Sequence, residues 1–424
     1  MSYQAVVTQL TNVRPHGNAD RLQLATIHGF QVVVGLDNHD GQRGVFFPCD
    51  GQLSEEFATA NDLVQRTDPE TGLRAGGYFA ANRRVRSQRL RGEKSDGFWT
   101  TLDALSFTGV DLESLPEGYL FDTINGIPIC NKYYTPATLR NIGKGGWARR
   151  DLAMFPKHVD TLRFQYEADE WLTPGSIVYI TEKLHGTSQR HSLSLETTKR
   201  PRRWYHKLFR RDPGEVSNWV FVLGTRNIVL LDSSQGFYED ESFRHRIGDS
   251  MRDQIHKGEV IFGEVVGFTN GNSPVMATQS TESLPEVRKQ YGDSMTYTYG
   301  CIPDQAKFYV YRIIQVNEDG IISELSWPQV KARCLELNLD FVPQLVEPRM
   351  VTGEDSISEI KEIVSREESG ASTLDQRHIR EGVVLRVERA DGRVGFLKSK
   401  SFEFGVLEGY IKTQDEYVDL EEIS

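Results

Sequence analysis

Short apolar runs separated by turn residues occupy the first third of the chain. Residues 31–34 read QVVV before a glycine, residues 44–48 read GVFFP, and apolar and polar residues alternate from 85 to 90. Apolar runs of this length, bounded by glycine and proline, are typical of β-strands, and their even spacing suits a small barrel. We therefore predict an OB-like β-barrel at residues 1–130, although strand spacing alone favours an ordinary β domain without a ligand.

The pattern changes after a connecting region at residues 131–175. Longer β-type runs lie at 176–180, 219–223, 259–262, 308–314, 382–387 and 394–397, with helix-like stretches at 327–337 and 356–367. This order predicts an α+β domain of antiparallel sheets with flanking helices at residues 176–424. Residues 271–304 show little periodicity, which predicts an insertion or a mobile loop.

Two common phosphate-binding patterns are not supported. Residues 141–148 (NIGKGGWA) match G-x-G-x-x-A loosely, but no apolar strand leads into them and no acidic residue closes a βαβ unit behind them. The chain also has no G-x-x-x-x-G-K-[ST] motif. We interpret 141–148 as part of a linker, so any use of ATP must rest on another fold.

Composition narrows the class of protein. The chain has 424 residues, four scattered cysteines without a C-x-x-C pair, and a formal net charge of −11. The cysteine pattern suggests neither a zinc site nor a disulfide framework. No apolar run approaches the roughly 20 residues that span a bilayer. We expect a soluble, cytoplasmic protein with no membrane partner, active as a monomer.

The net negative charge disfavours bulk coating of nucleic acid, but local basic stripes can still bind phosphates. One stripe lies at residues 199–211 and the other contains five arginines. Isolated stripes are more often solvated faces. The second stripe is nevertheless our candidate RNA-binding surface, and it comprises Arg83, Arg84, Arg86, Arg89 and Arg91.

Six short motifs follow one another in the C-terminal part of the chain. Each alone is more often an ordinary strand end, turn or loop, whereas six in one order indicate a common function. They read KLHGTS at 183–188, GTRN at 224–227, FGEVVG at 262–267, KFYVYRI at 307–313, EGVV at 381–384 and LKSK at 397–400.

Lys183 is the candidate nucleophile, because it follows a strand-like run and lies close to a glycine. An attacking amine must lose its proton, and lowering a lysine pKa from about 10.4 to about 7.5 requires about 4 kcal/mol. A nearby cation lowers the lysine pKa, because it disfavours the charged ammonium form. Lys398 and Lys400 share one face of a predicted strand and are candidates for this role, as is a bound Mg²⁺.

Two carboxylates beside glycines, Glu264 and Glu381, are candidates to bind a metal or a ribose hydroxyl. The sequence does not show which of them has which role. Phe308 and Tyr309 lie on opposite faces of one predicted strand, and we interpret Phe308 as the residue that stacks on a base. The planar guanidinium of Arg226 suits a ribose or phosphate oxygen. His185 fits a structural loop position and a role in chemistry equally well.

With these residues in place, the chain resembles the covalent nucleotidyltransferase superfamily of RNA ligases, DNA ligases and mRNA capping enzymes. The histidine in KLHG is typical of the T4 RNA ligase 2 group, whereas DNA ligases usually carry aspartate there. The extra domain precedes the motifs, as in RNA ligases of the Deinococcus and Naegleria type. The motif match covers residues 176–401, with expanded stretches at 196–218 and 268–305 whose substrate contacts cannot be inferred.

The resemblance implies an ATP-dependent RNA ligase that uses Mg²⁺, or Mn²⁺ in its place. Lys183 would form lysyl-AMP, AMP would pass to an RNA 5′-phosphate, and a 3′-hydroxyl would then seal the strand, as in the repair of a nicked duplex. The N-terminal module would hold RNA. The implied roles are Glu182 for adenine, Arg226 and Glu264 for the ribose, Phe308 for the base, Glu381 for metal, Lys398 and Lys400 for the triphosphate, and His185 after adenylylation.

Two other functions stay open. A capping-type guanylyltransferase would use the same lysine with GTP, so the nucleotide preference separates it from a ligase. A non-catalytic RNA-binding protein would bind RNA in a salt-dependent manner that Lys183→Ala leaves unchanged. The second is the weaker alternative, because simple binding does not require a lysine, two carboxylates and a distal lysine pair.

Overall fold

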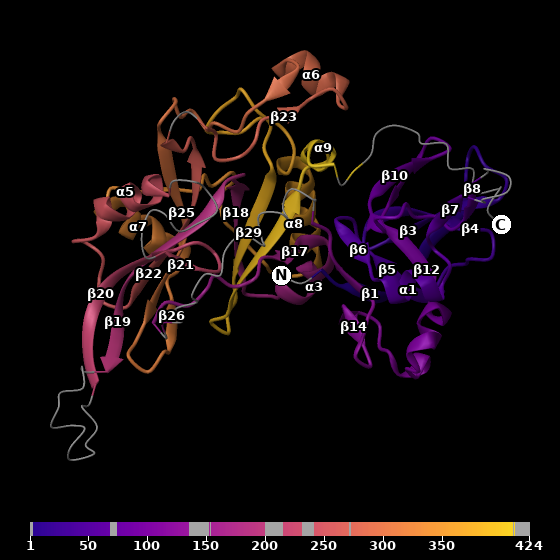
Figure 1. The fold of residues 1–424 in the computed structure, drawn as a ribbon, viewed down its shortest axis with the longest axis horizontal. Helices are drawn as coiled ribbons and strands as arrows, with labels where there is room; N and C mark the ends of the chain where they lie inside the picture. The colour runs from indigo at the N-terminus through magenta and orange to yellow at the C-terminus, as the bar shows by residue number, and fades with distance from the viewer. Residues whose placement is uncertain are drawn as a thin grey trace. The chain divides into compact units, whose positions relative to one another are not determined.

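The computed structural model of the chain describes residues 3–67, 74–134, 152, 154–199, 215–230, 241–270, 273–409 and 411. These residues divide into two compact units (Figure 1). One unit is made of residues 1–142, 280–292 and 402–424, and the other of residues 143–279 and 293–401. The segments 141–148 and 200–214, which include the linker motif and most of one basic stripe, lie outside the described residues.

The first unit is built mainly of short antiparallel strands. One sheet has the order β12-β5-β1-β13, two others have the orders β2-β3-β4 and β16-β6-β9, and β10 pairs with β11, β7 with β8 and β14 with β15. The bounds are β1 Ala5–Gln9, β2 Thr11–Pro15, β3 Leu22–Ile27, β4 Phe30–Gly35, β5 Arg43–Phe47, β6 Gly51–Leu53, β7 Gln65–Thr67, β8 Arg74–Gly76, β9 Arg84–Val85, β10 Ser87–Leu90, β11 Glu93–Asp96, β12 Phe98–Thr101, β13 Leu120–Phe121, β14 Thr123–Ile124, β15 Ile127–Pro128 and β16 Cys130–Lys132.

A short helix, α1 (Glu55–Ala60), closes the core of this unit. The Ser54 hydroxyl accepts a hydrogen bond from the Phe57 backbone N–H, which caps the helix, and two acidic residues follow in the first turn. The helix buries Phe57 against Phe47, with their ring centroids 5.1 Å apart. The predicted strands at 31–34 and 44–48 correspond to β4 and β5.

The second unit contains two larger sheets and four α-helices among its described residues. The five-stranded sheet has the order β17-β30-β29-β18-β28, and the larger sheet has the order β21-β20-β19-β22-β25-β26 with β27 paired to β25. Apart from β17 with β30 and β25 with β27, the pairs within these two sheets are antiparallel. The bounds are β17 Leu162–Arg163, α3 Phe164–Trp171, β18 Ile177–Lys183, β19 Thr187–Lys199, β20 Glu215–Gly224, β21 Val229–Leu230, α5 Ser242–Met251, β22 Glu259–Gly267, β24 Ser294–Met295, β25 Ala306–Val316, β26 Ile322–Glu324, α7 Trp327–Glu336, β27 Asp340–Phe341, β28 Arg349–Met350, α8 Glu354–Glu367, β29 Gly382–Glu388 and β30 Val394–Lys400; α6 (Pro285–Tyr291) and α9 (Phe402–Leu407) belong to the first unit.

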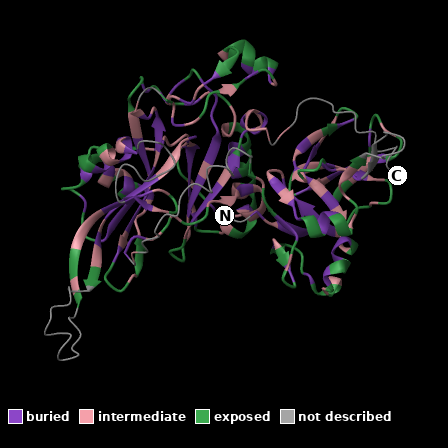
Figure 2. Ribbon diagram, in the orientation of Figure 1, coloured by how far each residue is buried: buried purple, intermediate pink, exposed green. Residues whose placement is uncertain are grey.

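Helices α3 and α8 cover one face of the five-stranded sheet. Their apolar residues pack on alternate residues of β18 and β29, which form a continuous buried cluster. On the other face, the Phe396 ring of β30 lies 5.2 Å from the His158 ring, and His158 lies 5.6 Å from the Phe262 ring of β22. This second face therefore looks toward the larger sheet. In Figure 2 the middle strands of both sheets are buried, whereas the far ends of β19 and β20 are exposed.

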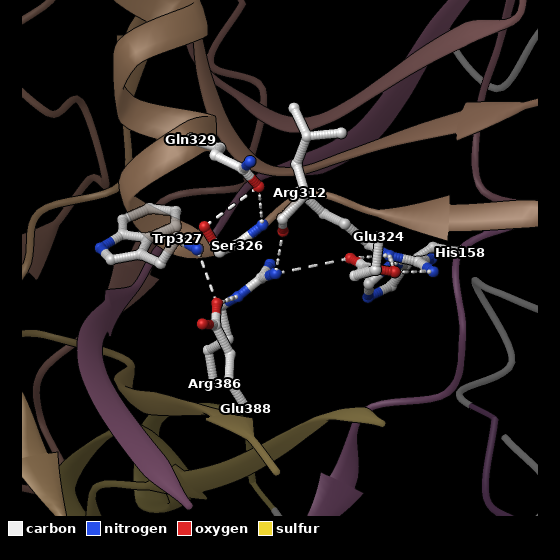
Figure 3. A network of polar contacts seen from close by, with 9 residues as sticks. His158, Arg312, Glu324, Ser326, Trp327, Gln329, Arg386 and Glu388 are labelled. Carbon is white, nitrogen blue, oxygen red and sulfur yellow. Dashed lines mark hydrogen bonds and ion pairs between the residues drawn. The ribbon is translucent and has the colours of Figure 1, made fainter. Parts of the chain in front are cut away.

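A network of charged side chains joins the two sheets (Figure 3). Arg312 of β25 donates to both oxygens of Glu324 in β26, at 2.7 to 3.0 Å. Arg386 of β29 lies 3.7 Å from Glu324 and donates to Glu388 at 2.8 Å. Glu388 in turn accepts the backbone N–H of Trp327 at 2.6 Å, at the start of α7. The network thus ties one end of the two sheets to a helix terminus.

The predicted α+β class with antiparallel sheets and flanking helices is confirmed. Residues 271–304 are predicted to be an insertion or a mobile loop, and the second of these alternatives does not fit the last part of the segment. Tyr297 and Tyr299 each have 1% of their surface exposed, and α6 and β24 also fall in this segment. Among the described residues, no helix is long and apolar enough to cross a membrane.

Candidate functional site

Lys183, Glu381 and Lys400 meet at one edge of the five-stranded sheet. The backbone register pairs Lys183 with Gly382 and Gly382 with Lys400, so the three strand ends lie side by side. The Lys183 Nζ is 2.9 Å from Glu381 Oε1, and the Lys400 Nζ is 3.1 Å from the same oxygen. Glu381 is 3% exposed, whereas the two lysines are partly open to solvent. The structure therefore brings together three of the predicted site residues.

Burial alone would raise the pKa of the Glu381 carboxyl, but the charges of Lys183 and Lys400, together with His185, hold this pKa well below its ordinary value. His185 Nδ1 lies 3.6 Å from Glu381 Oε2. Glu381 is thus an ionised carboxylate shared by two cations and an imidazole. A ligand that competes for Glu381 would release Lys183 from its ion pair.

Glu264 approaches the same group from the larger sheet. It lies in β22, and its Oε2 accepts a hydrogen bond from the Ser188 hydroxyl at 3.2 Å. Burial raises the pKa of Glu264 to about 7; Lys183 opposes this shift and the Glu381 carboxylate adds to it. Glu264 and Glu381 therefore interact across the space between the two sheets.

This raised pKa has a measurable effect on stability. A carboxyl with a folded pKa of about 7 and an ordinary value of 4.5 favours the folded state in its neutral form. The free energy of unfolding should therefore fall as the pH rises from 5 to 8, by at most about 3 kcal/mol. We expect Glu264→Gln to remove this dependence in urea unfolding without nucleotide or metal, whereas the exposed Glu318→Gln keeps it. If the free energy of unfolding changed with pH in the same way in wild type and in Glu264→Gln, the raised pKa would not belong to Glu264.

Glu182 has one bonded and one unbonded carboxylate oxygen. Its Oε2 accepts from the Thr373 N–H at 2.9 Å and from the Thr373 hydroxyl at 2.5 Å. Its Oε1 is buried and has no hydrogen-bond partner within the part of the chain that the structure describes. A buried carboxylate oxygen of this kind suits an N–H donor of a ligand, such as the amino group of adenine. Thr373 lies outside all six motifs and could not be identified from the sequence.

The structure shows which face of β25 each of the two candidate aromatic residues occupies. Phe308 lies on the face of β25 that α5 covers, where its ring is 5.2 Å from His191 and contacts the position of Gly263. Tyr309 pairs with Glu264 in the ladder, so its side chain lies on the Glu264 face. The two side chains do point to opposite faces, but Tyr309 rather than Phe308 faces the group around Lys183.

Arg226 and Lys398 are less closely tied to this group. Arg226 follows β20, and its guanidinium is 2.8 Å from the carboxylate of Asp160 with 43% of the side chain exposed. Lys398 lies two residues before Lys400 on β30 and shares its face by alternation. Their roles at the ribose and the triphosphate stay predictions.

A buried ion pair beneath the site was not found from the sequence. Arg244 and Glu241 have no exposed side-chain surface and are joined at 2.6 Å. Arg244 also donates to the Thr187 hydroxyl at 2.6 Å and to the Ser188 carbonyl at 3.2 Å. It therefore supports the backbone just after the KLHG sequence, on the side of β19 opposite Glu264.

The carboxylates fit a magnesium-type metal, which binds oxygen ligands and usually keeps several waters beside one or two carboxylates and substrate phosphates. Among the described residues, no three His, Cys, Asp or Glu side chains are grouped to hold a metal by themselves. Glu381 and Glu264 would supply the protein ligands. When bound, the metal would offset phosphate charge.

The N-terminal arginine stripe is not one uniform surface. Only 9% of the Arg84 side chain is exposed. Its guanidinium lies 3.9 Å from the Asp50 carboxylate and over the Tyr133 ring, so Arg84 does not belong to an exposed basic surface. Arg83 donates to the Leu53 carbonyl at 3.1 Å. Arg86 is half-buried, and Arg89 and Arg91 are exposed.

Comparison with known proteins identifies the family of this chain. The RNA ligase family model matches residues 176–400, more than half of the chain, and the chain therefore belongs to the RNA ligase family. This confirms the resemblance drawn from the six motifs. No curated protein matches the chain.

Solved structures of the Naegleria gruberi RNA ligase share the fold. A mutant with ATP and Mn has a TM-score of 0.58 at 18% identity, covering 97% of this chain and 99% of that chain. Another mutant with ATP and Mn gives 0.59 at 18% identity, with 95% and 98% covered. A mutant with AMP and Mn gives 0.58 at 18% identity, also with 95% and 98% covered. At this identity the likeness establishes the fold.

Proposed function

We propose that this protein is an ATP-dependent RNA ligase that joins 3′-hydroxyl and 5′-phosphate ends through a covalent lysyl-AMP intermediate. The observation that supports this most directly is the position of Lys183, 2.9 Å from a carboxylate that also binds Lys400. A nucleophilic amine needs a group that orients it and cations that stabilise charge on the phosphate. This arrangement supplies both.

The reaction follows in three transfers. The neutral Lys183 amine attacks the α-phosphorus of ATP, a P–N bond forms, and the bond to the bridging oxygen breaks to release pyrophosphate. An oxygen of the RNA 5′-phosphate then attacks the same phosphorus, which breaks the P–N bond. Finally the RNA 3′-hydroxyl attacks the 5′-phosphorus and AMP leaves. Lys400 lies close enough to Lys183 to stabilise the negative charge that develops on the phosphate in the first transfer.

We assign the base to the space between Glu182 and Tyr309. Glu182 presents a buried carboxylate oxygen. Its negative charge also contributes to the raised pKa of the Tyr309 hydroxyl, so the two side chains lie near each other. Tyr309 would stack on the purine. ATP and a divalent metal are also what several mutants of the Naegleria gruberi RNA ligase hold in their structures.

Labelling with α-labelled ATP or GTP tests this function. We expect covalent label from ATP in the presence of Mg²⁺ or Mn²⁺, followed by sealing of a nicked RNA duplex. Label from GTP alone would favour a capping-type guanylyltransferase. Absence of label in protein freed of bound AMP, together with salt-dependent RNA binding, would favour the binding protein.

The N-terminal unit is proposed to hold RNA through the exposed part of the arginine stripe. The Arg89→Ala/Arg91→Ala double variant should weaken RNA binding and lower the slope of log K against log salt by about 2, because each phosphate contact contributes about 1. Lysyl-AMP formation should be unchanged. The matched control removes two exposed arginines of the other unit, Arg366 and Arg393. Equal loss of RNA affinity in both double variants would rule out a specific surface.

A further inference from the structure

The segment from residue 295 to 301, which the sequence suggested would be mobile, is packed directly against the loop that follows Lys183. The His185 backbone N–H donates to the Tyr299 hydroxyl at 2.6 Å. The Tyr297 ring packs edge-on against the His185 imidazole, with centroids 4.8 Å apart. Both tyrosines are 1% exposed. One buried segment therefore contacts both the backbone and the side chain of His185.

Tyr299 adopts a backbone conformation that its side chain does not favour. Its φ is 50°, in the left-handed region, where a bulky residue is rare. Such conformations persist when the surrounding contacts determine them, and they concentrate at functional sites. Here the contacts come from a third segment, residues 372–379, which lies just before Glu381.

His378 holds the Tyr299 backbone. Its Nε2 accepts the Tyr299 N–H at 3.3 Å, so its Nδ1 carries the proton and donates to the Ile379 carbonyl at 3.0 Å. The two rings lie 4.5 Å apart in an edge-on arrangement. His378 is fully buried, and it therefore acts as a rigid neutral support for Tyr299.

Asp375 fixes the residues on either side of Tyr299. Its Oδ2 accepts from the Thr298 hydroxyl at 2.7 Å and from the Gly300 N–H at 2.9 Å. Arg377 donates to the same carboxylate at 2.8 and 2.9 Å. Residues 298, 299 and 300 are thus each bound by the segment that leads to Glu381.

Lys183 and His185 are held by different means. Lys183 is the last residue of β18, and its backbone pairs with Gly382 of β29. His185 lies two residues beyond this ladder, where the Tyr299 hydroxyl binds its N–H. Removing that hydroxyl should displace His185 while leaving the nucleophile on its strand.

We propose that Tyr299 is a positioning residue for His185, supported by His378 and Asp375, and that it serves the steps after lysine adenylylation rather than adenylylation itself. The assignment of steps rests on the proposed ligase function. The positioning role rests on the contacts alone. The cluster Tyr297, Tyr299 and His378 thereby couples the RNA-joining steps to a segment outside the six motifs.

Tyr299→Phe is the most direct test, because it removes the hydroxyl and keeps the buried ring. We expect single-turnover lysyl-AMP formation to stay within about threefold of wild type. Sealing of a nicked RNA that already carries the 5′-AMP should fall by about tenfold or more, which corresponds to the loss of one hydrogen bond in a buried site. The His185→Ala variant should show the same division between steps. Tyr119→Phe, on an exposed tyrosine, is the matched control.

Amide hydrogen exchange tests the positioning without relying on activity. The His185 amide should exchange at least about tenfold faster in Tyr299→Phe, whereas the amides of β18 should keep their protection. Unchanged exchange at His185 would overturn the proposal, as would equal loss of adenylylation and sealing, or no loss of sealing. If wild type forms no lysyl-AMP, the proposed function fails, and the exchange result still decides whether Tyr299 positions His185.

Discussion

Lys183→Ala is expected to abolish covalent labelling by α-labelled ATP and to reduce sealing of nicked RNA by roughly 10⁴-fold or more, as removal of a covalent nucleophile generally does. The physical reason is the absence of an amine to form the P–N bond. Sealing of RNA that already carries a 5′-AMP should survive, because that step does not use the lysine. Lys361→Ala, on the exposed side of α8, is the control for loss of one positive charge.

The same experiment separates Lys183 from Lys400, because both ammonium groups bind Glu381 Oε1. Lys400→Ala should slow labelling but leave the label on Lys183, which peptide mapping of the labelled protein detects. Label that persists in Lys183→Ala and maps to Lys400 would contradict our assignment. Loss of label in both variants, with normal folding, would mean that Lys400 is essential for the same step.

Arg244→Ala should cause the largest loss of stability, about 3–5 kcal/mol, because it leaves Glu241 buried without its partner. Arg244 and Glu241 are both fully enclosed, and Arg244 also bonds the backbone and side chains that follow the KLHG sequence. The free energy of unfolding in urea measures this loss. We also expect sealing to fall, since Thr187 and Ser188 lose their support.

Arg252→Ala is the matched control for this prediction. Arg252 adjoins the end of the same helix and pairs with Asp249 three residues away at 2.6 Å, but both side chains are at least half exposed. Exposed pairs of this kind contribute about 0.2–1 kcal/mol. If Arg252→Ala and Arg244→Ala cost the same, the buried pair is not the stabilising element that its burial indicates.

The sequence was a reliable guide to the strands and to the order of the motifs. Periodicity located β18, β22, β25, β29 and β30 because each is a long apolar run with a residue preference typical of strands. Lys398 and Lys400 both lie in β30, two residues apart, so the predicted strand and its alternation apply to them. These features depend on residues that are neighbours in the chain, so the sequence pattern predicts them.

Features that depend on packing partners could not be read in this way. Alternation showed that Phe308 and Tyr309 face opposite sides, but only the position of α5 decides which side is covered. The sequence also does not show why a glycine lies beside each of the two carboxylates. A Cβ at Gly263 would meet the Phe308 ring at 2.5 Å, and one at Gly382 would meet the Ser399 carbonyl at 2.1 Å. Both glycines are required by neighbouring strands.

Residues 295–301 show the same limit. Their polar and aromatic sequence has no period, so they resemble a loop, and their burial comes from Asp375 and His378, which are distant in the chain. Long-range hydrogen bonds to side chains leave no periodic pattern in a single sequence.

The side-by-side arrangement of Lys183, Gly382 and Lys400 also has a consequence for biosynthesis. Lys183 is synthesised long before the strands β29 and β30 that bring Glu381 and Lys400 to it. Pairings between such distant segments form late in folding, and a slip of one residue would turn both lysines to the opposite face. A nascent chain on the ribosome therefore carries Lys183 without its partners, and the group around Glu381 is complete only when the end of the domain has emerged and paired in register.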